Sequence, residues 1–210
     1  MENLTKEEYG QYAALCECGM RIVLARIENL RQEAEVFSVD RSPFASIQSR
    51  IKTFESATNK CLDRGNTCDM KAIKKLHDIA GIRITCSFVD DAYRLSDLLT
   101  RQDDITVRDV KDYIAQPKAN GYKSLHVIVE VPVYLSTGRV DVPVEVQFRT
   151  IAMDFWASLE HKIYYKYDRL VPAELLDELK DAAETASELD ARMERLHREI
   201  RGPRPGIVSL

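Results

Sequence analysis

Two neighbouring segments in the second half of the chain alternate apolar and polar residues with a period of two. The apolar positions are Leu125, Val127, Val129 and Val131 in residues 124–135, and Val140, Val142, Val144, Val146 and Phe148 in residues 140–150. Such alternation is typical of strands that bury one face. Only residues 136–139 separate the segments, and they include Gly138, which suits a hairpin turn. The sequence therefore predicts a β-hairpin with one apolar face and one polar face.

The polar face of this hairpin carries side chains that can do chemistry. Glu145, Gln147 and Arg149 lie two residues apart and so share one face of their strand, and we expect His126 to join them from the first strand. The loop before that strand, residues 116–121, is indicated by its Pro, Asn and Gly. Residues 118–123, which run from this loop to the start of the strand, bring two lysines, an amide and a tyrosine to the start of the same face. The alternative is an ordinary solvated sheet face.

The rest of the chain mixes helix and strand patterns. The predicted helices are residues 5–34, 46–62 and 91–99, one capped by Thr150, and a last one from Pro172 to about residue 200; the other predicted strands are residues 79–88 and 105–113. The first helix opens with a capping box at Thr5 and Glu8. In the second helix, Lys52, Ser56 and Lys60 are four residues apart and are expected on one helix face.

The last helix has apolar residues that alternate in steps of four and three. They are Leu175, Leu179, Ala182, Ala186, Leu189, Met193, Leu196 and Ile200. This repeat favours a coiled-coil-like seam. Two partners remain open for the seam, the first helix of the same chain or another copy of the protein. Residues 202–210, which contain two Gly and two Pro, are expected to be a disordered tail.

Composition excludes several classes of partner and location. The chain has 210 residues, 45% of them hydrophobic and 30% charged, which is typical of one domain with a buried core. A formal net charge of −4 gives no global basic field for DNA. We expect no membrane span and no export signal, because no long apolar run occurs and the N-terminus lacks a basic segment followed by an apolar one. Five cysteines without a CxxC pair favour reduced thiols in the cytoplasm.

Two carboxylates and several basic residues are candidates for a phosphate-transfer site. Such a transfer needs cations around the phosphates, carboxylates that hold Mg²⁺, and a base at the attacking oxygen. Asp78 and Glu145 are the candidate magnesium ligands, and the basic residues of the predicted second helix would supply positive charge. Each carboxylate also has a structural interpretation, since Asp78 could cap a turn and Glu145 could pair with a neighbouring arginine.

Three ordered motifs carry a family resemblance. Residues 78–84 read Asp-Ile-Ala-Gly-Ile-Arg-Ile, residues 118–126 read Lys-Ala-Asn-Gly-Tyr-Lys-Ser-Leu-His, and residues 144–150 read Val-Glu-Val-Gln-Phe-Arg-Thr, followed by Ala-Met-Asp-Phe-Trp at 152–156 and Leu-Glu-His at 159–161. Together they closely resemble the synthetase domain of RelA/SpoT homologues, and more narrowly the stand-alone small alarmone synthetases of the RelQ type. The resemblance runs from about residue 42 to residue 167.

The resemblance implies an α+β fold with a nucleotidyltransferase-like mixed β-sheet flanked by helices. It implies one (p)ppGpp synthetase domain over residues 1–201, with a catalytic core at about 42–167 and long helical flanks at residues 5–35 and 172–200. The implied activity is that of a GTP diphosphokinase, the magnesium-dependent transfer of the β,γ-pyrophosphate of ATP to the ribose 3′-hydroxyl of GDP or GTP. A homotetramer is also implied. We expect no alarmone hydrolysis, because a hydrolase domain does not fit in 210 residues.

By motif position, the resemblance also implies a role for each site residue. On the ATP side, Arg50 and Arg83 would sandwich the adenine, and Lys52, Ser56 and Lys60 would hold the phosphates. On the acceptor side, Tyr122 would stack on guanine with Asn120 near its edge, and Lys118, His126 and Gln147 would meet the phosphates or the ribose. Asp78 and Glu145 would bind Mg²⁺, and Glu145 would help to deprotonate the 3′-hydroxyl.

Two positions depart from the family pattern. Residues 61–64 read Cys-Leu-Asp-Arg where relatives usually continue a basic run, and Asp154 stands where close relatives often have Asn. A second interpretation is therefore kept, a catalytically inactive module of the same fold that binds nucleotide or single-stranded RNA. The pair Asp78 and Glu145 favours the enzyme, because binding an anion does not require two carboxylates.

Overall fold

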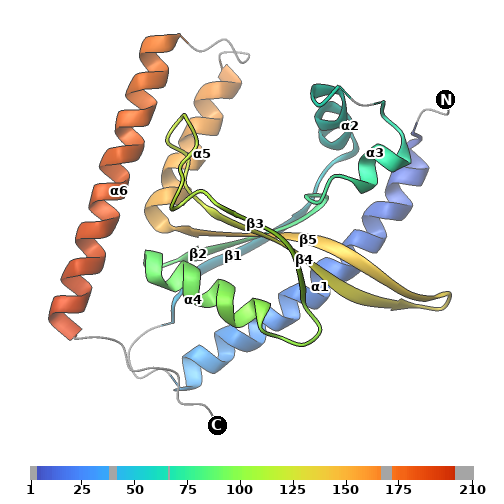
Figure 1. The fold of residues 1–210 in the computed structure, drawn as a ribbon, viewed down its shortest axis with the longest axis horizontal. Coiled ribbons are helices and arrows are strands. Elements are labelled where there is room, and N and C mark those ends of the chain that lie inside the picture. Colours follow the sequence, from blue (N-terminus) through green and yellow to red (C-terminus); the bar gives the residue numbers. More distant parts are fainter. Residues whose placement is uncertain (1–3, 38–41, 66, 167–171, 202–210) are drawn as a thin grey trace.

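The computed structural model describes residues 4–37, 42–65, 67–166 and 172–201 (Figure 1). The elements are α1 (Lys6–Phe37), β1 (Phe44–Ile51), α2 (Phe54–Asp63), α3 (Met70–Lys74), β2 (Ala80–Cys86), α4 (Val89–Thr100), β3 (Thr106–Asp112), β4 (Leu125–Leu135), β5 (Gly138–Thr150), α5 (Ile151–Lys166) and α6 (Ala173–Arg201). Among these helices, none is both long and apolar enough to cross a membrane. The predicted tail at residues 202–210 lies outside the described residues.

The five strands form one mixed sheet in the order β1-β2-β5-β4-β3. Strands β2 and β5 are parallel, and the other neighbours are antiparallel. The predicted hairpin is β4 and β5, which pair from Leu125 with Phe148 to Leu135 with Gly138. Gly138 has a φ of 120°, a backbone conformation that side chains disfavour. The predicted mixed sheet with flanking helices is confirmed.

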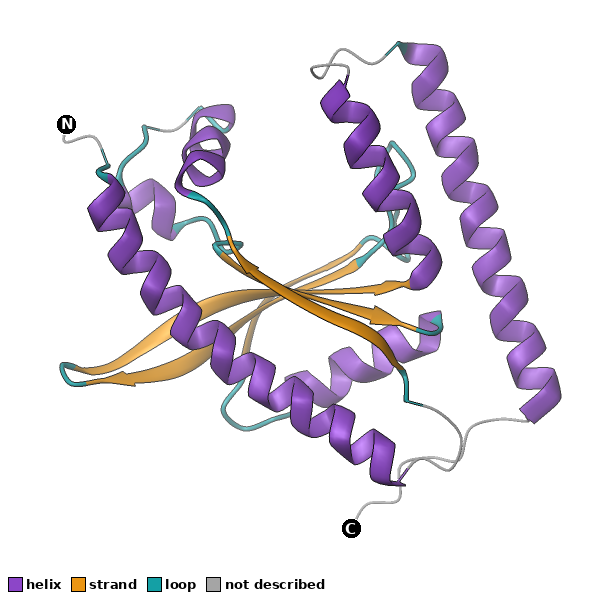
Figure 2. Cartoon of the chain, turned by 180° about the vertical axis from the view of Figure 1, so that it is seen from behind, coloured by secondary structure: helices purple, strands orange, loops and turns teal. Residues whose placement is uncertain are grey.

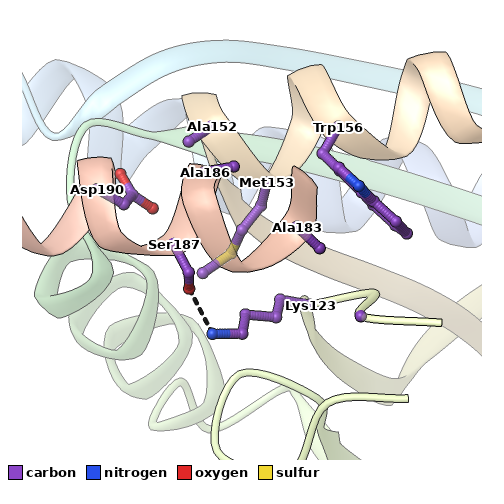
Figure 3. Close-up of a pocket in the computed structure, with 9 residues that line it drawn as sticks. Lys123, Ala152, Met153, Trp156, Ala183, Ala186, Ser187 and Asp190 are labelled. Carbon is purple, nitrogen blue, oxygen red and sulfur yellow. Dashed lines mark hydrogen bonds between the residues drawn. The ribbon is translucent and has the colours of Figure 1, made fainter. Parts of the chain in front are cut away.

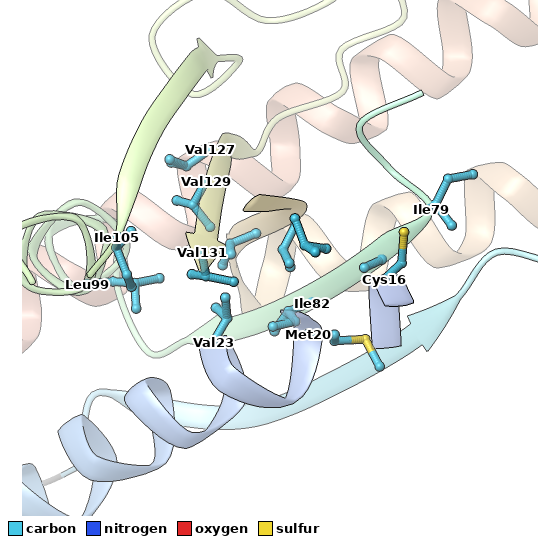
Figure 4. Close-up of a cluster of buried hydrophobic side chains, with 14 of the residues drawn as sticks. Cys16, Met20, Val23, Ile79, Ile82, Leu99, Ile105, Val127, Val129 and Val131 are labelled. Carbon is cyan, nitrogen blue, oxygen red and sulfur yellow. The ribbon is translucent and has the colours of Figure 1, made fainter. Parts of the chain in front are cut away.

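One face of the sheet forms the main core with α1 and α4 (Figures 2 and 4). The predicted face of α1 is buried at Tyr9, Cys16, Met20, Val23 and Ile27, and its capping box is present, with Glu8 N donating to Thr5 Oγ1 at 3.2 Å. Helix α1 approaches β5 so closely that a Cβ added at Gly19 would lie 2.6 Å from Val142 Cγ1. Because α1 and α4 cover this face, the polar residues of the strands face the opposite side.

The predicted helix over residues 46–62 is wrong in its first half. Residues 44–51 form strand β1, which pairs antiparallel with β2, and helix α2 begins only at Phe54. The strand ends at Ile51, and Thr53 caps the helix by accepting a hydrogen bond from Ser56 N at 3.2 Å. Residues 44–51 form a strand because they pair with the edge of β2. The spacing of charged residues along the chain carries no information about such a partner. The short helix α3, which Asp69 caps, was not predicted either.

Helices α5 and α6 pack on each other beyond the polar face of the sheet, while α2 and α3 stand at its other end (Figures 1 and 2). Thr150 caps α5 as predicted, since its Oγ1 accepts from Met153 N at 3.2 Å. Of the two partners left open for the seam of the last helix, the first helix is contradicted, because α6 packs on α5 and most of the seam stays exposed. The other partner left open, another copy of the protein, stays a prediction.

Candidate functional site

Asp78 lies just before β2, and two lysine side chains contact its carboxylate. Its Oδ2 accepts from Lys60 Nζ at 2.5 Å and lies 3.1 Å from Lys52 Nζ. Its Oδ1 is buried and has no hydrogen-bond partner in the structure. Burial opposes ionisation of this carboxyl, but the two lysines outweigh it and hold the pKa of Asp78 below its ordinary value. Asp78 is therefore an ionised carboxylate with one oxygen left for another ligand.

The two lysines reach Asp78 from different elements. Lys60 belongs to α2, whereas Lys52 belongs to the connection between β1 and α2, where its backbone N–H donates to the Ile79 carbonyl at 2.8 Å. Ser56 lies in the first turn of α2 and accepts from the Thr53 hydroxyl at 3.0 Å. The predicted single helix face for Lys52, Ser56 and Lys60 is thus wrong, although the structure does bring both lysines to one carboxylate.

Strand pairing brings the predicted sheet residues into rows on the polar face. Arg83 pairs with Gln147, which pairs with His126. In the next row Arg50 pairs with Gly81, which pairs with Glu145. Because paired residues of neighbouring strands point to the same face, five of the predicted site residues lie on one side of the sheet. Gly81 contributes no side chain between Arg50 and Glu145.

Glu145 is held by two hydrogen bonds. Its Oε1 lies 3.2 Å from His126 Nδ1, and its Oε2 accepts from Gln147 Nε2 at 2.6 Å. Burial raises the pKa of Glu145, yet His126 and Gln147 outweigh burial and the nearby Asp78 charge, so its pKa lies below the ordinary value. Asp78 and Glu145 therefore lie close enough for their charges to interact.

The loop before β4 places its aromatic and basic residues beside this carboxylate. The Tyr122 hydroxyl lies 2.8 Å from His126 Nε2, and Lys118 Nζ lies 4.8 Å from the Tyr122 ring centroid. Burial lowers the pKa of Lys118, Glu145 raises it and Lys60 lowers it. Lys118 therefore lies near Glu145 and also near Lys60, the lysine that contacts Asp78. Asn120 joins the loop to α5, since its Nδ2 donates to Glu160 Oε1 at 3.2 Å, and its Oδ1 accepts from Tyr122 N at 3.2 Å.

Arg149 was not among the predicted site residues, although it contacts two of them. Its Nη2 donates to the Tyr122 hydroxyl at 2.6 Å and to Gln147 Oε1 at 3.2 Å. Its Nη1 donates to Asp154 Oδ1 at 3.1 Å, and the same oxygen lies 3.2 Å from Arg83 Nη1. The alternation that placed Glu145 and Gln147 on the polar face placed Arg149 there too. This shared face was the sequence signal from which Arg149 could have been predicted as a site residue.

The loop is also attached to α6 (Figure 3). Lys123 Nζ donates to Ser187 Oγ, and Thr150 Oγ1 donates to Asp190. Gly121 has a φ of 86°, and an added Cβ would lie only 2.6 Å from Ala183 Cβ. A small pocket between the loop, α5 and α6 is lined by Gly121, Lys123, Ala152, Met153, Trp156, Ala183, Ala186, Ser187 and Asp190. Helix α6 therefore helps to hold the loop that carries Tyr122.

Comparison with known proteins gives consistent similarities. A protein-family profile described as "Region found in RelA / SpoT proteins" matches residues 49–170. The chain is 52% identical over 161 residues to GTP pyrophosphokinase YwaC of Bacillus subtilis, covering 76% of this chain and 76% of the relative. It is 39% identical over 161 residues to GTP pyrophosphokinase YjbM of the same organism, covering 77% of this chain and 75% of the relative.

Solved structures show the same similarity. The crystal structure of small alarmone synthetase 2 from B. subtilis matches with a TM-score of 0.82 and 42% identity, covering 91% of this chain and 99% of that one. Small alarmone synthetase 1 from B. subtilis, bound to its product pppGpp, matches with a TM-score of 0.86 and 33% identity, covering 93% and 99%. These matches confirm the predicted fold class and the family resemblance.

Proposed function

This chain belongs to the RelA/SpoT family, and we propose that it is a GTP diphosphokinase that makes ppGpp or pppGpp from ATP and GDP or GTP. The observation that carries the proposal is that Glu145, on the polar face of the sheet, and Asp78, just before β2, lie close enough for their charges to interact, with Lys52, Lys60 and Lys118 around them. The named function of relatives at 52% and 39% identity supports it, as does pppGpp bound to a structural neighbour.

Magnesium fits the residues present. Mg²⁺ prefers oxygen ligands and is usually held by one or two carboxylates together with substrate phosphates. Asp78 supplies a buried oxygen without a partner, and Glu145 is a nearby ionised carboxylate. Within the described residues there is no group of three or more His, Cys, Asp or Glu suited to a metal, so substrate phosphates would complete the coordination. When bound, Mg²⁺ would neutralise charge on the transferred phosphates.

The ATP side is the β1, β2 and α2 end of the site. Arg50 and Arg83 lie on neighbouring strands of the same face, where their planar guanidinium groups can stack on adenine. Lys52 and Lys60 would contact the phosphates, with Ser56 in the first turn of α2, where backbone N–H groups also favour anions. Because both lysines already contact Asp78, the nucleotide phosphates would share these lysines with this carboxylate.

The acceptor side is the β4, β5 and loop end. Tyr122 would stack on guanine, with Asn120 near its edge, while Lys118, His126 and Gln147 would meet the phosphates or ribose. In the reaction, the acceptor 3′-oxygen bonds to the β-phosphorus of ATP, the bond from that phosphorus to the oxygen of AMP breaks, and Glu145 takes the hydroxyl proton. The ionised state of Glu145 suits a base.

Assembly into a homo-oligomer, with a tetramer implied by the resemblance, is also part of the proposal. Its support is the exposed seam of α6, in which Leu189, Met193, Leu196 and Ile200 are 55%, 51%, 41% and 80% exposed. Rows of exposed apolar side chains commonly mark protein interfaces. A cytoplasmic location and binding of single-stranded RNA stay predictions of the sequence.

The test is to incubate the purified protein with Mg²⁺, ATP labelled in its terminal phosphate, and GDP or GTP. We expect labelled ppGpp or pppGpp with matching AMP. Glu145→Gln should lower the rate at least about 100-fold, the range lost with a general base, while ATP still binds. Glu188→Gln, on the exposed face of α6, is the control and should leave the rate unchanged. Binding of both nucleotides without any product would support the inactive module instead.

A further inference from the structure

We propose that Arg149 is a positioning residue of the acceptor site, which holds Tyr122 in place for stacking, and that Asp154 ties Arg149 to Arg83 of the ATP side. This inference rests on the proposed function, which assigns Tyr122 to the acceptor base. It adds two residues and a physical link between the two nucleotide sites.

Burial shows that Arg149 has an internal role. Its side chain is only 6% exposed, which is rare for arginine, and a buried guanidinium is costly unless it is paired and hydrogen-bonded. Its partners are Asp154, Gln147 and Tyr122. Two of these three belong to the proposed acceptor site, so the guanidinium is held at that site.

Arg149 holds Tyr122 at two points. It donates to the phenol oxygen at 2.6 Å, and its guanidinium carbon lies 5.1 Å from the ring centroid, within the range of a cation–π contact. Since the phenol oxygen accepts from Arg149, its own proton is free to point at His126 Nε2, 2.8 Å away. The hydroxyl is therefore held between β5 and β4, which restrains the ring that would stack on guanine.

Asp154 serves two arginines with one oxygen. Its Oδ1 lies 3.1 Å from Arg149 Nη1 and 3.2 Å from Arg83 Nη1. The pKa of Arg83 is lowered first by burial and then by the charge of Arg149, and Asp154 opposes both effects. One carboxylate thus reduces the repulsion between the buried Arg149 and the half-buried Arg83, so a change at Asp154 should reach both nucleotide sites.

The first test compares Arg149→Gln with Arg149→Lys in steady-state kinetics. We expect Arg149→Gln to raise the KM for GDP about tenfold, the loss expected for one charged hydrogen bond, with less than about a threefold change in the KM for ATP. Arg149→Lys keeps the charge, so its KM for GDP should lie between those of wild type and Arg149→Gln. Arg139→Gln, an exposed arginine on the same strand, is the control. If Arg149→Gln raises both KM values equally and lowers kcat and Tm to match, Arg149 is a merely structural residue and the proposal is overturned.

The second test is a double-mutant cycle with Tyr122→Phe, read by calorimetric binding of GDP without Mg²⁺. If Arg149 acts through the Tyr122 hydroxyl, Arg149→Gln should weaken GDP binding much less in the Tyr122→Phe background. Additive effects would overturn the inference while leaving the proposed function intact. A wild-type protein that neither binds GDP nor makes product would overturn the proposed function and this inference with it.

Asp154→Asn tests the link between the sites. Asn keeps an oxygen for the hydrogen bonds but removes the charge shared by Arg83 and Arg149. We expect the KM values for ATP and GDP both to rise several-fold, unlike the one-sided effect of Arg149→Gln. A rise in the KM for ATP alone would overturn the link between the two sites and leave Asp154 as a partner of Arg83 only.

Discussion

At the scale of single residues, the charged groups of the site are kept ionised by their neighbours. Asp78 is paired with Lys52 and Lys60, and Glu145 is hydrogen-bonded by His126 and Gln147. In both carboxyls these contacts outweigh burial and lower the pKa. An ionised carboxylate is the form that binds a cation and accepts a proton, so the surroundings prepare both groups for the proposed chemistry.

The pKa of Asp190 is shifted in the opposite direction, above its ordinary value. This residue of α6 is 9% exposed, and burial raises its pKa, although the hydrogen bond from Thr150 and the charge of Lys123 oppose the rise. The folded state therefore holds the proton more tightly than the unfolded state. Between the unfolded pKa, about 4 for aspartate, and the higher folded pKa, stability falls as pH rises.

Replacing Asp190 with Asn should remove this pH dependence. Asn can still accept the Thr150 hydrogen bond, so the fold should persist. We expect the free energy of unfolding of wild type to fall relative to Asp190→Asn as pH rises from about 4 to 7. Urea unfolding at several pH values measures this difference. The exposed Asp181→Asn on the same helix is the control, and a difference for Asp190→Asn that stays constant with pH would contradict the prediction.

At the scale of elements, the loop that carries Tyr122 depends on a helix that begins about fifty residues later in the sequence. Gly121 passes so close to Ala183 that only glycine fits there, and Lys123 bonds Ser187 of the same helix. Trp156 of α5 also donates to the Leu179 carbonyl at 2.9 Å. Helix α6 thus connects the loop to α5, and its packing determines where the acceptor-side residues lie.

Gly121→Ala should displace the loop. The added Cβ would meet Ala183 and also force a side chain into positive φ, which costs about 1 kcal/mol even without a clash. We expect the KM for GDP to rise at least several-fold, with a smaller change for ATP. Gly65→Ala is a matched control, because Gly65 has a φ of 68° but open space around its Cβ position. Equal effects of the two variants on the KM for GDP would refute the role of the Ala183 contact.

At the scale of the whole molecule, the chain has an apolar core on one face of its sheet and a polar site on the other. The exposed seam of α6 is not part of either. Its exposed part is Leu189, Met193, Leu196 and Ile200, whereas residues such as Leu179, Ala183, Ser187 and Asp190 make the contacts of α6 within the chain. Covering the seam would remove apolar side chains from water, which favours association.

The double variant Met193→Glu and Leu196→Glu should therefore weaken assembly without unfolding the chain. Both side chains are exposed, so the charges would meet water in a monomer but would be buried in an interface. Light scattering after gel filtration should show a smaller mass than for wild type, with unchanged far-ultraviolet circular dichroism. Glu188→Lys, also exposed on α6, controls for a change of charge. An unchanged oligomeric mass for the double variant would exclude this seam as the interface.

The elements that could be predicted from the sequence are those whose signal is local. The period of two in residues 124–150 located β4 and β5 and assigned Glu145, Gln147 and His126 to one face, because side chains of a strand must alternate. The spacing of apolar residues located α1 and its buried face, and the motifs identified the family. These features depend on near neighbours in the chain, so they can be read without the fold.

Features that depend on distant partners became visible in the folded chain alone. Strand β1 forms because β2 pairs with it, and Lys52 and Lys60 meet at Asp78 although they belong to different elements. The seam of α6 remained exposed because other residues of that helix fit α5 and the loop better. Arg149 gained its significance from Tyr122 and Asp154. Such contacts join residues far apart in the sequence, and local periodicity carries no information about which of them will meet.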